Sequence, residues 1–230
     1  MKFAGGKIKI LAGTGANSTA EAIFLTKAAE KVGADGSLQV APYYNKPTQE
    51  GLFQHFHAIA RATKLPIMLY SIPGRCGIEI GVDTINHLVH DSVNIVGIKE
   101  AGGNPDRVSQ LRAVLGDKFT IMSGDDSLTL PFMAVGAQGV ISVASNIIPR
   151  EVSHMVKAYA MGKAAVALKL HQKFYPVFKD LFIETNPVPV KAALAMLGMM
   201  EEEFRLPLVP MTSANREKLR KTLKTVGVLK

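Results

Sequence analysis

The sequence has few of the residues that build metal centres and covalent cross-links. Its 230 residues include one cysteine, Cys76, which excludes an internal disulfide and a metal site made of clustered cysteines. The six histidines show no spacing typical of metal ligands. Asp125 and Asp126 form a short carboxylate pair, but no His or Glu cluster accompanies them. We therefore expect no metal site.

Long apolar runs are absent too. No segment is long and apolar enough to span a bilayer, and the residues after Met1 lack the hydrophobic stretch of a secretory signal. The sequence therefore predicts no membrane contact and, by default, a cytoplasmic location.

The chain also lacks a motif that reads nucleic acid, although its formal net charge is +8. The densest basic run covers residues 216–224, where charged and apolar residues alternate at helical spacing. That pattern is typical of the solvent-facing side of a terminal helix. We expect no nucleic-acid partner, and small acidic substrates fit the basic balance equally well.

What is present is a regular alternation of strand and helix patterns. Hydrophobic residues make up 47% of the chain and charged residues 20%, as in ordinary soluble proteins. Six strand-like runs are each followed by a helical pattern, which predicts βαβ units, a parallel sheet and right-handed connections. Ser18 and Thr48 are the expected N-caps of the first two helices. The predicted strands cover residues 7–12, 36–41, 66–70, 94–99, 119–123 and 139–143.

Strand patterns stop after Gly162. Three later helical patterns cover residues 163–182, 188–197 and 213–226, and proline-bearing turns separate them. We therefore divide the chain into a βα region, residues 1–162, and a C-terminal helical region, residues 163–230, which caps the first rather than forming an independent domain.

The predicted strand at residues 94–99 is an apolar run that ends in one lysine, Lys99, and two glycines follow in the turn. A buried parallel strand is almost wholly apolar, so a charge at its end needs an explanation. In α/β folds the carboxyl ends of the strands carry the active site. A lysine in an apolar pocket there can lose its proton and attack a carbonyl carbon as an amine. The alternative interpretation is a lysine that extends its ammonium from the strand end into water.

Polar residues gather at other predicted strand ends as well. Tyr70 offers a hydroxyl that can transfer protons, and Arg75 in the following loop can hold a carboxylate with two hydrogen bonds. Residues 13–15 read Gly-Thr-Gly, which lacks the third glycine and the lysine of known phosphate-binding loops. The further polar strand ends are residues 43–45, 123–126 and 142–146.

Six motifs together resemble the dihydrodipicolinate synthase family, whose members are pyruvate-dependent class I aldolases with a lysine Schiff base. The resemblance implies an α/β fold of the (β/α)8 TIM-barrel type, of which residues 1–162 hold six βα units, strands three to eight of the family fold. The motifs are residues 13–19 (Gly-Thr-Gly-Ala-Asn-Ser-Thr), 42–51 (Pro-Tyr-Tyr-Asn-Lys-Pro-Thr-Gln-Glu-Gly), 69–75 (Leu-Tyr-Ser-Ile-Pro-Gly-Arg), 97–100 (Gly-Ile-Lys-Glu), 123–126 (Ser-Gly-Asp-Asp) and 186–191 (Asn-Pro-Val-Pro-Val-Lys).

The resemblance implies that the chain condenses pyruvate with aspartate semialdehyde in lysine and diaminopimelate biosynthesis. Lys99 would form an imine with the pyruvate ketone, so no external cofactor is needed. Tyr70 would relay protons, and Arg75 would steer the carboxylate of aspartate semialdehyde. Tyr44 would join the proton relay of a neighbouring subunit, which implies a homodimer or homotetramer. The remaining matches are Gly124 and Ile141 as substrate contacts and Asn17, Glu21 and Tyr43 as parts of a lysine feedback site.

The sequence departs from the family pattern at its start. A barrel of about 250 residues has roughly 30 residues in each βα unit. Two units of the family barrel, about 60 residues that would precede Lys7, are therefore missing from this sequence. They include the Gly-Thr-Thr-Gly-Glu motif, whose threonines bind the pyruvate carboxylate in the family. Two missing strands would leave open sheet edges. We expect a true start upstream of Met1, in preference to strand exchange with another chain or an open sheet, and weak or absent synthase activity from these residues.

Two other functions stay open from the sequence. One is a catalytically inactive remnant with a structural or regulatory role, which the missing threonine motif favours. The other is a related sugar-acid lyase, such as N-acetylneuraminate lyase, against which the Pro-x-Arg setting of Arg75 argues.

Overall fold

The computed structural model describes residues 1–230 and has an α/β fold. Its six strands are hydrogen-bonded in the order of the sequence, from β1 to β6. The chain forms two compact units, Met1–Met122 with Val135–Gln138 and Ser123–Ala134 with Gly139–Lys230. The boundary thus crosses β5 (Thr120–Ser123). The division between residues 162 and 163 rests on the type of secondary structure and stays a prediction.

The strands of the first unit are short and parallel, with one register shift between β3 and β4 at Ile67 and Met68. Val40 pairs with Tyr70, and Tyr70 pairs with Lys99. Because side chains alternate between the two faces of a sheet, these three residues share one face. The neighbouring pair, Leu69 and Ile98, lies on the opposite face and is fully buried. The strands are β1 (Leu11–Gly13), β2 (Gly36–Val40), β3 (Ile67–Ser71) and β4 (Ile95–Glu100).

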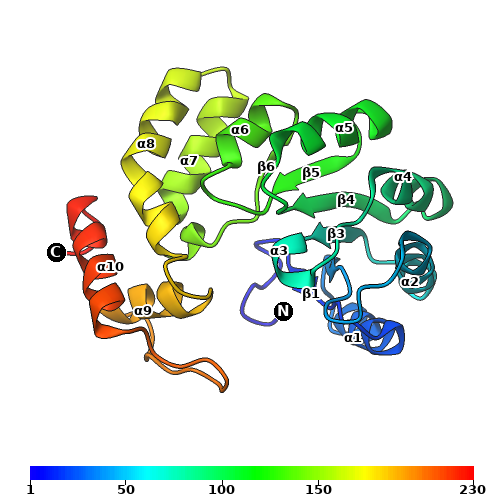
Figure 1. Ribbon diagram of the computed structural model, residues 1–230, viewed down its shortest axis with the longest axis horizontal. Helices are drawn as coiled ribbons and strands as arrows, with labels where there is room; N and C mark the ends of the chain where they lie inside the picture. Colours follow the sequence, from blue (N-terminus) through cyan, green and yellow to red (C-terminus); the bar gives the residue numbers. More distant parts are fainter. The chain divides into compact units, whose positions relative to one another are not determined.

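Four long helices connect these strands and lie side by side (Figure 1). The Ser18 hydroxyl accepts a hydrogen bond from the Glu21 N–H, and the Thr48 hydroxyl accepts one from the Gly51 N–H, so both predicted N-caps are confirmed. The second helix buries Leu52, Phe56 and Ile59 at the spacing of one helix face. The four helices are α1 (Thr19–Lys31), α2 (Gln49–Arg61), α4 (Val82–Asp91) and α5 (Pro105–Leu115).

The second unit is mainly helical around its own apolar core. Buried residues from its helices, such as Met155, Val177 and Leu219, belong to one cluster. The Asp180 carboxylate accepts a hydrogen bond of 2.5 Å from the Thr222 hydroxyl, which ties α8 to α10. Figure 1 shows these two helices adjacent. The elements are α6 (Thr129–Ala134), β6 (Gly139–Val140), the 3-10 turn η1 (Ala144–Asn146), α7 (Pro149–Ala160), α8 (Ala164–Asp180), α9 (Val188–Met196) and α10 (Ser213–Thr225).

Side-chain hydrogen bonds shorten two of the predicted strands. The strand predicted for residues 7–12 begins only at Leu11, because the Asp35 carboxylate takes the Ile10 N–H at 2.9 Å. The strand predicted for residues 139–143 ends at Val140, and the N–H groups of Val143 and Ala144 donate to the Asp126 carboxylate instead of to a strand. The loop predicted after Tyr70, which carries Arg75, contains a short helix, α3 (Pro73–Cys76).

A buried histidine between α1 and α2 predicts that the first unit loses stability in mild acid. His55 is 5% exposed, and its Nδ1 lies 2.9 Å from the Thr19 hydroxyl. Burial lowers the pKa of His55 from 6.5 to about 4. Between pH 6.5 and 4, His55 therefore binds a proton in the unfolded chain but not in the folded chain. The stability of the fold thus falls as the pH falls from 6.5 towards 4. At pH 5 the loss is about 2 kcal/mol.

Thermal unfolding of wild type and His55→Asn between pH 7.5 and 4.5 measures this effect. The asparagine does not titrate, so we expect the stability of the two proteins to converge as the pH falls. His154→Asn, on the exposed side of α7, is the control and should follow the wild-type curve. Parallel curves for wild type and His55→Asn would contradict the assignment.

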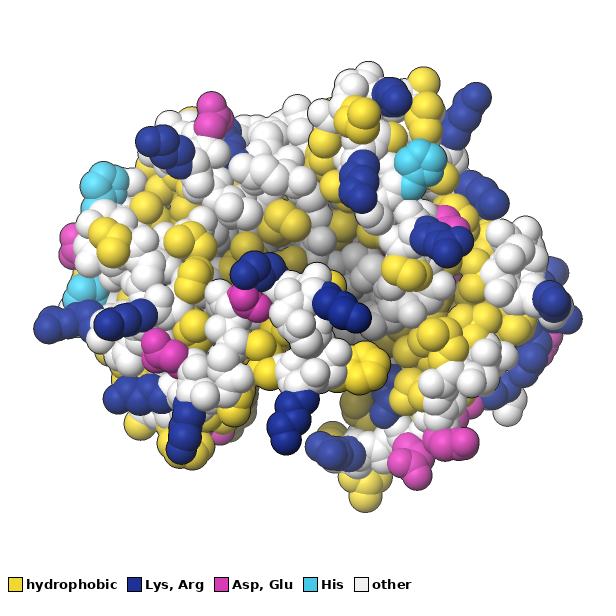
Figure 2. Space-filling model, turned by 180° about the vertical axis from the view of Figure 1, so that it is seen from behind, with side chains coloured by type: hydrophobic (Ala, Val, Ile, Leu, Met, Phe, Trp, Pro, Cys, Tyr) yellow, Lys and Arg dark blue, Asp and Glu magenta, His cyan; other side chains and the backbone are white.

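The face shown in Figure 2 carries its positive charge in a dispersed form. On this face, lysine and arginine side chains stand among acidic and apolar ones and form no continuous stripe. None of the helices combines the length and apolar character needed to cross a membrane.

Candidate functional site

Lys99 and Tyr70 meet at the carboxyl ends of neighbouring strands. Register pairing places them on one face, and the Lys99 Nζ lies 4.2 Å from the centre of the Tyr70 ring. Both side chains are half-buried. Burial raises the pKa of the Tyr70 hydroxyl, although the positive charge of Arg75 opposes the shift. The hydroxyl is therefore protonated at neutral pH and can both donate and accept a proton beside the amine.

Arg75 comes from the turn that follows β3. The turn forms α3, which ends at Gly77, where the backbone adopts a positive φ of 70° that suits glycine. Arg75 is exposed, while the adjacent Cys76 is buried and anchors the turn. Burial raises the pKa of the Cys76 thiol, so it is a packing group rather than a nucleophile. The charge of Arg75 lowers the pKa of Tyr70 against the effect of burial, so Arg75 lies near Tyr70. A joint role of Lys99, Tyr70 and Arg75 in one site stays a prediction.

The predicted feedback residues lie partly together. Asn17 donates a hydrogen bond of 3.2 Å to the Tyr43 carbonyl and accepts one of 3.0 Å from Asn45 through its own carbonyl. Glu21 is exposed in the first turn of α1.

Tyr44, the residue predicted to join a neighbouring subunit's proton relay, is 90% exposed. It has a positive φ of 72°, a costly conformation for a bulky residue.

A buried polar cluster, which the sequence did not predict, supports the Gly-Thr-Gly segment at residues 13–15. The Gln39 amide lies within 2.8 Å of the hydroxyls of Thr14, Thr26 and Ser37, and all four side chains are buried. A Cβ on Gly15 would meet the Val40 nitrogen at 2.4 Å. The Gly-Thr-Gly segment is therefore a tight structural turn, held by its threonine, rather than an open phosphate-binding loop. Only the alternation of Ser37 and Gln39 within an otherwise apolar strand signals the cluster.

Gly124 and Ile141 lie in the second unit, around a buried aspartate. The Asp126 carboxylate accepts hydrogen bonds of 3.0 Å from the N–H groups of Val143 and Ala144 and one from the Ser142 hydroxyl. The Ile141 N–H donates to the Ser123 carbonyl at 2.9 Å. Burial raises the pKa of Asp126 against these hydrogen bonds. The aspartate thus shapes the loop that carries Ile141, and contact of Gly124 and Ile141 with substrate stays a prediction.

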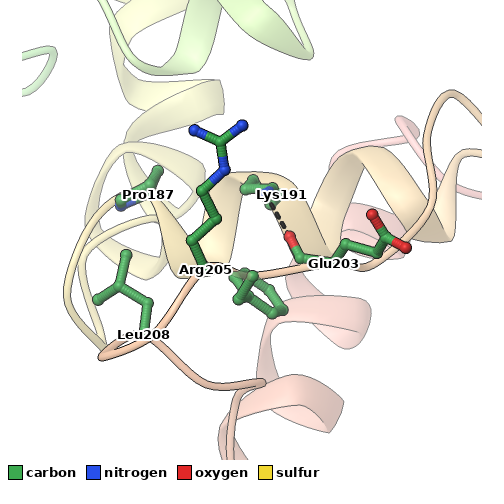
Figure 3. Close-up of a pocket in the computed structure, with 6 residues that line it drawn as sticks. Pro187, Lys191, Glu203, Arg205 and Leu208 are labelled. Carbon is green, nitrogen blue, oxygen red and sulfur yellow. Dashed lines mark hydrogen bonds between the residues drawn. The ribbon is translucent and has the colours of Figure 1, made fainter.

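A cavity of about 650 Å³ lies in the second unit. Figure 3 shows Lys191 on α9 with its ammonium bonded to the Glu203 carbonyl, while the Glu203 carboxylate points away. The Lys191 Nζ also lies 5.0 Å from the Phe204 ring centre. The lysine of the Asn-Pro-Val-Pro-Val-Lys motif therefore ties the loop at residues 203–208 to α9. The lining residues are Pro187, Lys191, Glu203, Phe204, Arg205 and Leu208.

A lysine at the end of a parallel strand, 4.2 Å from the centre of a tyrosine ring, is the arrangement expected of an α/β lyase of the aldolase type. A family model described as the dihydrodipicolinate synthetase family matches residues 1–226. The chain belongs to this family.

Similar proteins and solved structures support the same family. The 4-hydroxy-tetrahydrodipicolinate synthase of Sulfurihydrogenibium sp. (strain YO3AOP1) is 55% identical over 225 residues, which are 97% of this chain and 77% of that protein. The solved structure of the synthase from Methylacidiphilum fumariolicum SolV has a TM-score of 0.97 at 61% identity and is covered to 75%. The crystal structure of dihydrodipicolinate synthase from Aquifex aeolicus has a TM-score of 0.97 at 52% identity and is covered to 78%. The chain thus spans about three quarters of the length of these relatives.

Proposed function

We propose that this chain acts as a 4-hydroxy-tetrahydrodipicolinate synthase, which condenses pyruvate with aspartate semialdehyde in lysine and diaminopimelate biosynthesis. The observation that carries the proposal is the position of the Lys99 Nζ, 4.2 Å from the Tyr70 ring centre at the ends of paired strands. The names of the relatives support the same reaction. The cytoplasmic location predicted from the sequence fits a biosynthetic role.

The proposed reaction needs no external cofactor. The Lys99 amine attacks the pyruvate ketone carbon, and loss of water from the resulting carbinolamine leaves an imine. Loss of a methyl proton converts the imine to an enamine, whose carbon attacks the aldehyde of aspartate semialdehyde. Attack of that substrate's own amino group on the imine carbon then closes a ring and expels the free Lys99 amine. In this sequence of steps the Tyr70 hydroxyl carries protons to and from the reacting atoms. Arg75 binds the carboxylate of the second substrate through two hydrogen bonds.

We further infer that the six βα units form part of a (β/α)8 barrel. The sequential order of parallel strands and the superposition on solved synthases support this architecture. We also propose a homodimer or homotetramer in which Tyr44 enters the site of a neighbouring subunit. Its 90% exposure and positive φ support that role, because an exposed tyrosine in such a conformation has no packing function within its own chain.

Single-turnover trapping tests the proposed reaction one step at a time. Pyruvate is added first, and borohydride then reduces any imine to a stable adduct. Addition of aspartate semialdehyde before the borohydride should discharge the imine and lower the trapped fraction. A trapped fraction that N-acetylmannosamine lowers, and aspartate semialdehyde does not, would contradict the synthase assignment.

Arg75→Met should weaken the second half of the reaction only. The variant loses two charge-assisted hydrogen bonds to the second substrate, so we expect the aspartate semialdehyde concentration for half-discharge to rise about tenfold or more. The pyruvate concentration for half-maximal trapping should stay within about twofold, since that step precedes the second substrate. Arg61→Met, at the exposed end of α2, is the matched control. An equal rise for both substrates would show that Arg75 acts on the whole site.

A further inference from the structure

A buried ion pair lies directly behind the proposed site. Glu100 follows Lys99 on β4, and because side chains alternate, it points to the opposite face of the sheet. Its carboxylate is 0% exposed and accepts hydrogen bonds of 2.7 Å from the Gly102 N–H and 2.7 Å from the Arg107 Nε. Arg107 comes from the first turn of α5 and is also buried. The reaction described above uses neither residue.

The same guanidinium reaches the segment that carries Arg75. Arg107 donates to the Ile80 carbonyl and, at 3.2 Å, to the Glu79 carboxylate. Residues 71–80, here called the Arg75 loop, run from the end of β3 to this point. One side chain therefore links the far end of the Arg75 loop to the strand that carries Lys99.

The near end of the Arg75 loop is attached to the same strand end. Ser71 pairs with Glu100 in the register, and its carbonyl accepts a hydrogen bond of 2.9 Å from the Ala101 N–H. The Ser71 hydroxyl in turn accepts one of 3.5 Å from the Ile80 N–H, which joins the two ends of the loop. The exposed Arg75 thus projects from a loop whose two ends are fixed against β4.

Gly102 shows how closely these parts fit. A Cβ at this position would lie 2.7 Å from the Glu100 Oε1, 3.2 Å from a Glu79 oxygen and 3.7 Å from the Pro73 ring. The turn after Lys99 therefore packs under α3 with no space for a side chain. Such close packing restricts movement of the loop. An active site requires this precision, because a displacement of about 1 Å can lower the rate about 10²-fold.

We propose that Glu100 and Arg107 are positioning residues that hold the Arg75 loop in place beside Lys99, and so govern the use of the second substrate rather than capture of the first. The inference rests on the proposed function of Lys99 and Arg75. Glu100→Gln is the test variant, because the amide keeps the size and one acceptor but removes the charge that binds Arg107. Asp35→Asn, which breaks the exposed Lys9–Asp35 ion pair, is the matched control.

Two readouts on the full chain separate this inference from the proposed function. The first needs no activity: native trypsin cleavage after Arg75 and amide exchange across residues 71–80 should both rise about fivefold or more in Glu100→Gln. The second is kinetic: half-discharge of the trapped imine should need about tenfold more aspartate semialdehyde, with pyruvate capture within about twofold. Asp35→Asn should match wild type in both.

Glu79→Gln provides a milder variant if Glu100→Gln unfolds. Glu79 is exposed and forms only the outer arm of the network, so we expect the same changes at smaller size. The inference would be overturned if a folded variant protected the Arg75 loop from trypsin and from amide exchange as well as wild type does. A loosened loop with unchanged discharge by aspartate semialdehyde would overturn it too. Absence of any imine in wild type would instead count against the proposed function, while loop protection would still test the positioning role.

Discussion

Lys99→Arg is expected to abolish pyruvate capture while the protein stays folded. The arginine has a similar length and can reach over the Tyr70 ring, where the Lys99 Nζ lies 4.2 Å from the ring centre, but a guanidinium does not deprotonate and cannot form the imine. We expect no pyruvate-dependent mass increase after borohydride and a rate of product formation lower by at least about 10⁴-fold. Intact-protein mass spectrometry and a pyruvate-consumption assay measure the two effects.

Lys27→Arg is the matched control for this prediction. Lys27 is exposed on α1, so the same substitution there should leave trapping and rate at wild-type values. Circular dichroism should give the same spectrum for all three proteins. A trapped adduct of wild-type yield in Lys99→Arg would show that another amine captures pyruvate.

Tyr70→Phe should slow both halves of the reaction without preventing imine formation. The phenylalanine ring still packs beside the Lys99 Nζ, but the hydroxyl that passes protons is gone. Loss of a positioned acid–base group typically costs about 10²–10⁴-fold, and we expect a decrease of that size in the rate of trapping and in the rate of discharge. Rapid-quench borohydride trapping over time measures each rate.

The final trapped yield separates this role from a role in binding. If Tyr70 only transfers protons, Tyr70→Phe should reach the wild-type yield of adduct at long times, because a catalyst does not change the equilibrium. Tyr175→Phe, a half-exposed tyrosine on α8, controls for the substitution itself. A yield that stays low at saturating pyruvate would mean that the hydroxyl mainly binds the substrate.

The arrangement of strands and helices was predictable because local rules agree along this sequence. Apolar runs mark β2 to β5, and Ser18 and Thr48 mark helix starts with their own hydroxyls. The predictions fail where a distant side chain competes for the backbone. Asp35 and Asp126 each take N–H groups that the local pattern assigns to a strand ladder, and no periodicity signals those partners.

The candidate site divides in the same way. Lys99 and Tyr70 were predictable, because a polar residue at the end of an apolar strand stands out and neighbouring parallel strands bring such ends together. Arg107 was not, since it is an ordinary charged residue in a helical pattern and only the fold buries it against Glu100. The hydroxyl cluster around Gln39 is likewise a product of tertiary packing.

The most direct test of the account is the location of the trapped adduct in the wild-type chain. After incubation with pyruvate and borohydride, proteolysis and mass spectrometry should find the reduced adduct on the peptide that contains Lys99, and on no other lysine in comparable yield. Omission of pyruvate should remove it. An adduct spread over surface lysines, or none on a chain shown to be folded, would contradict the central role of Lys99.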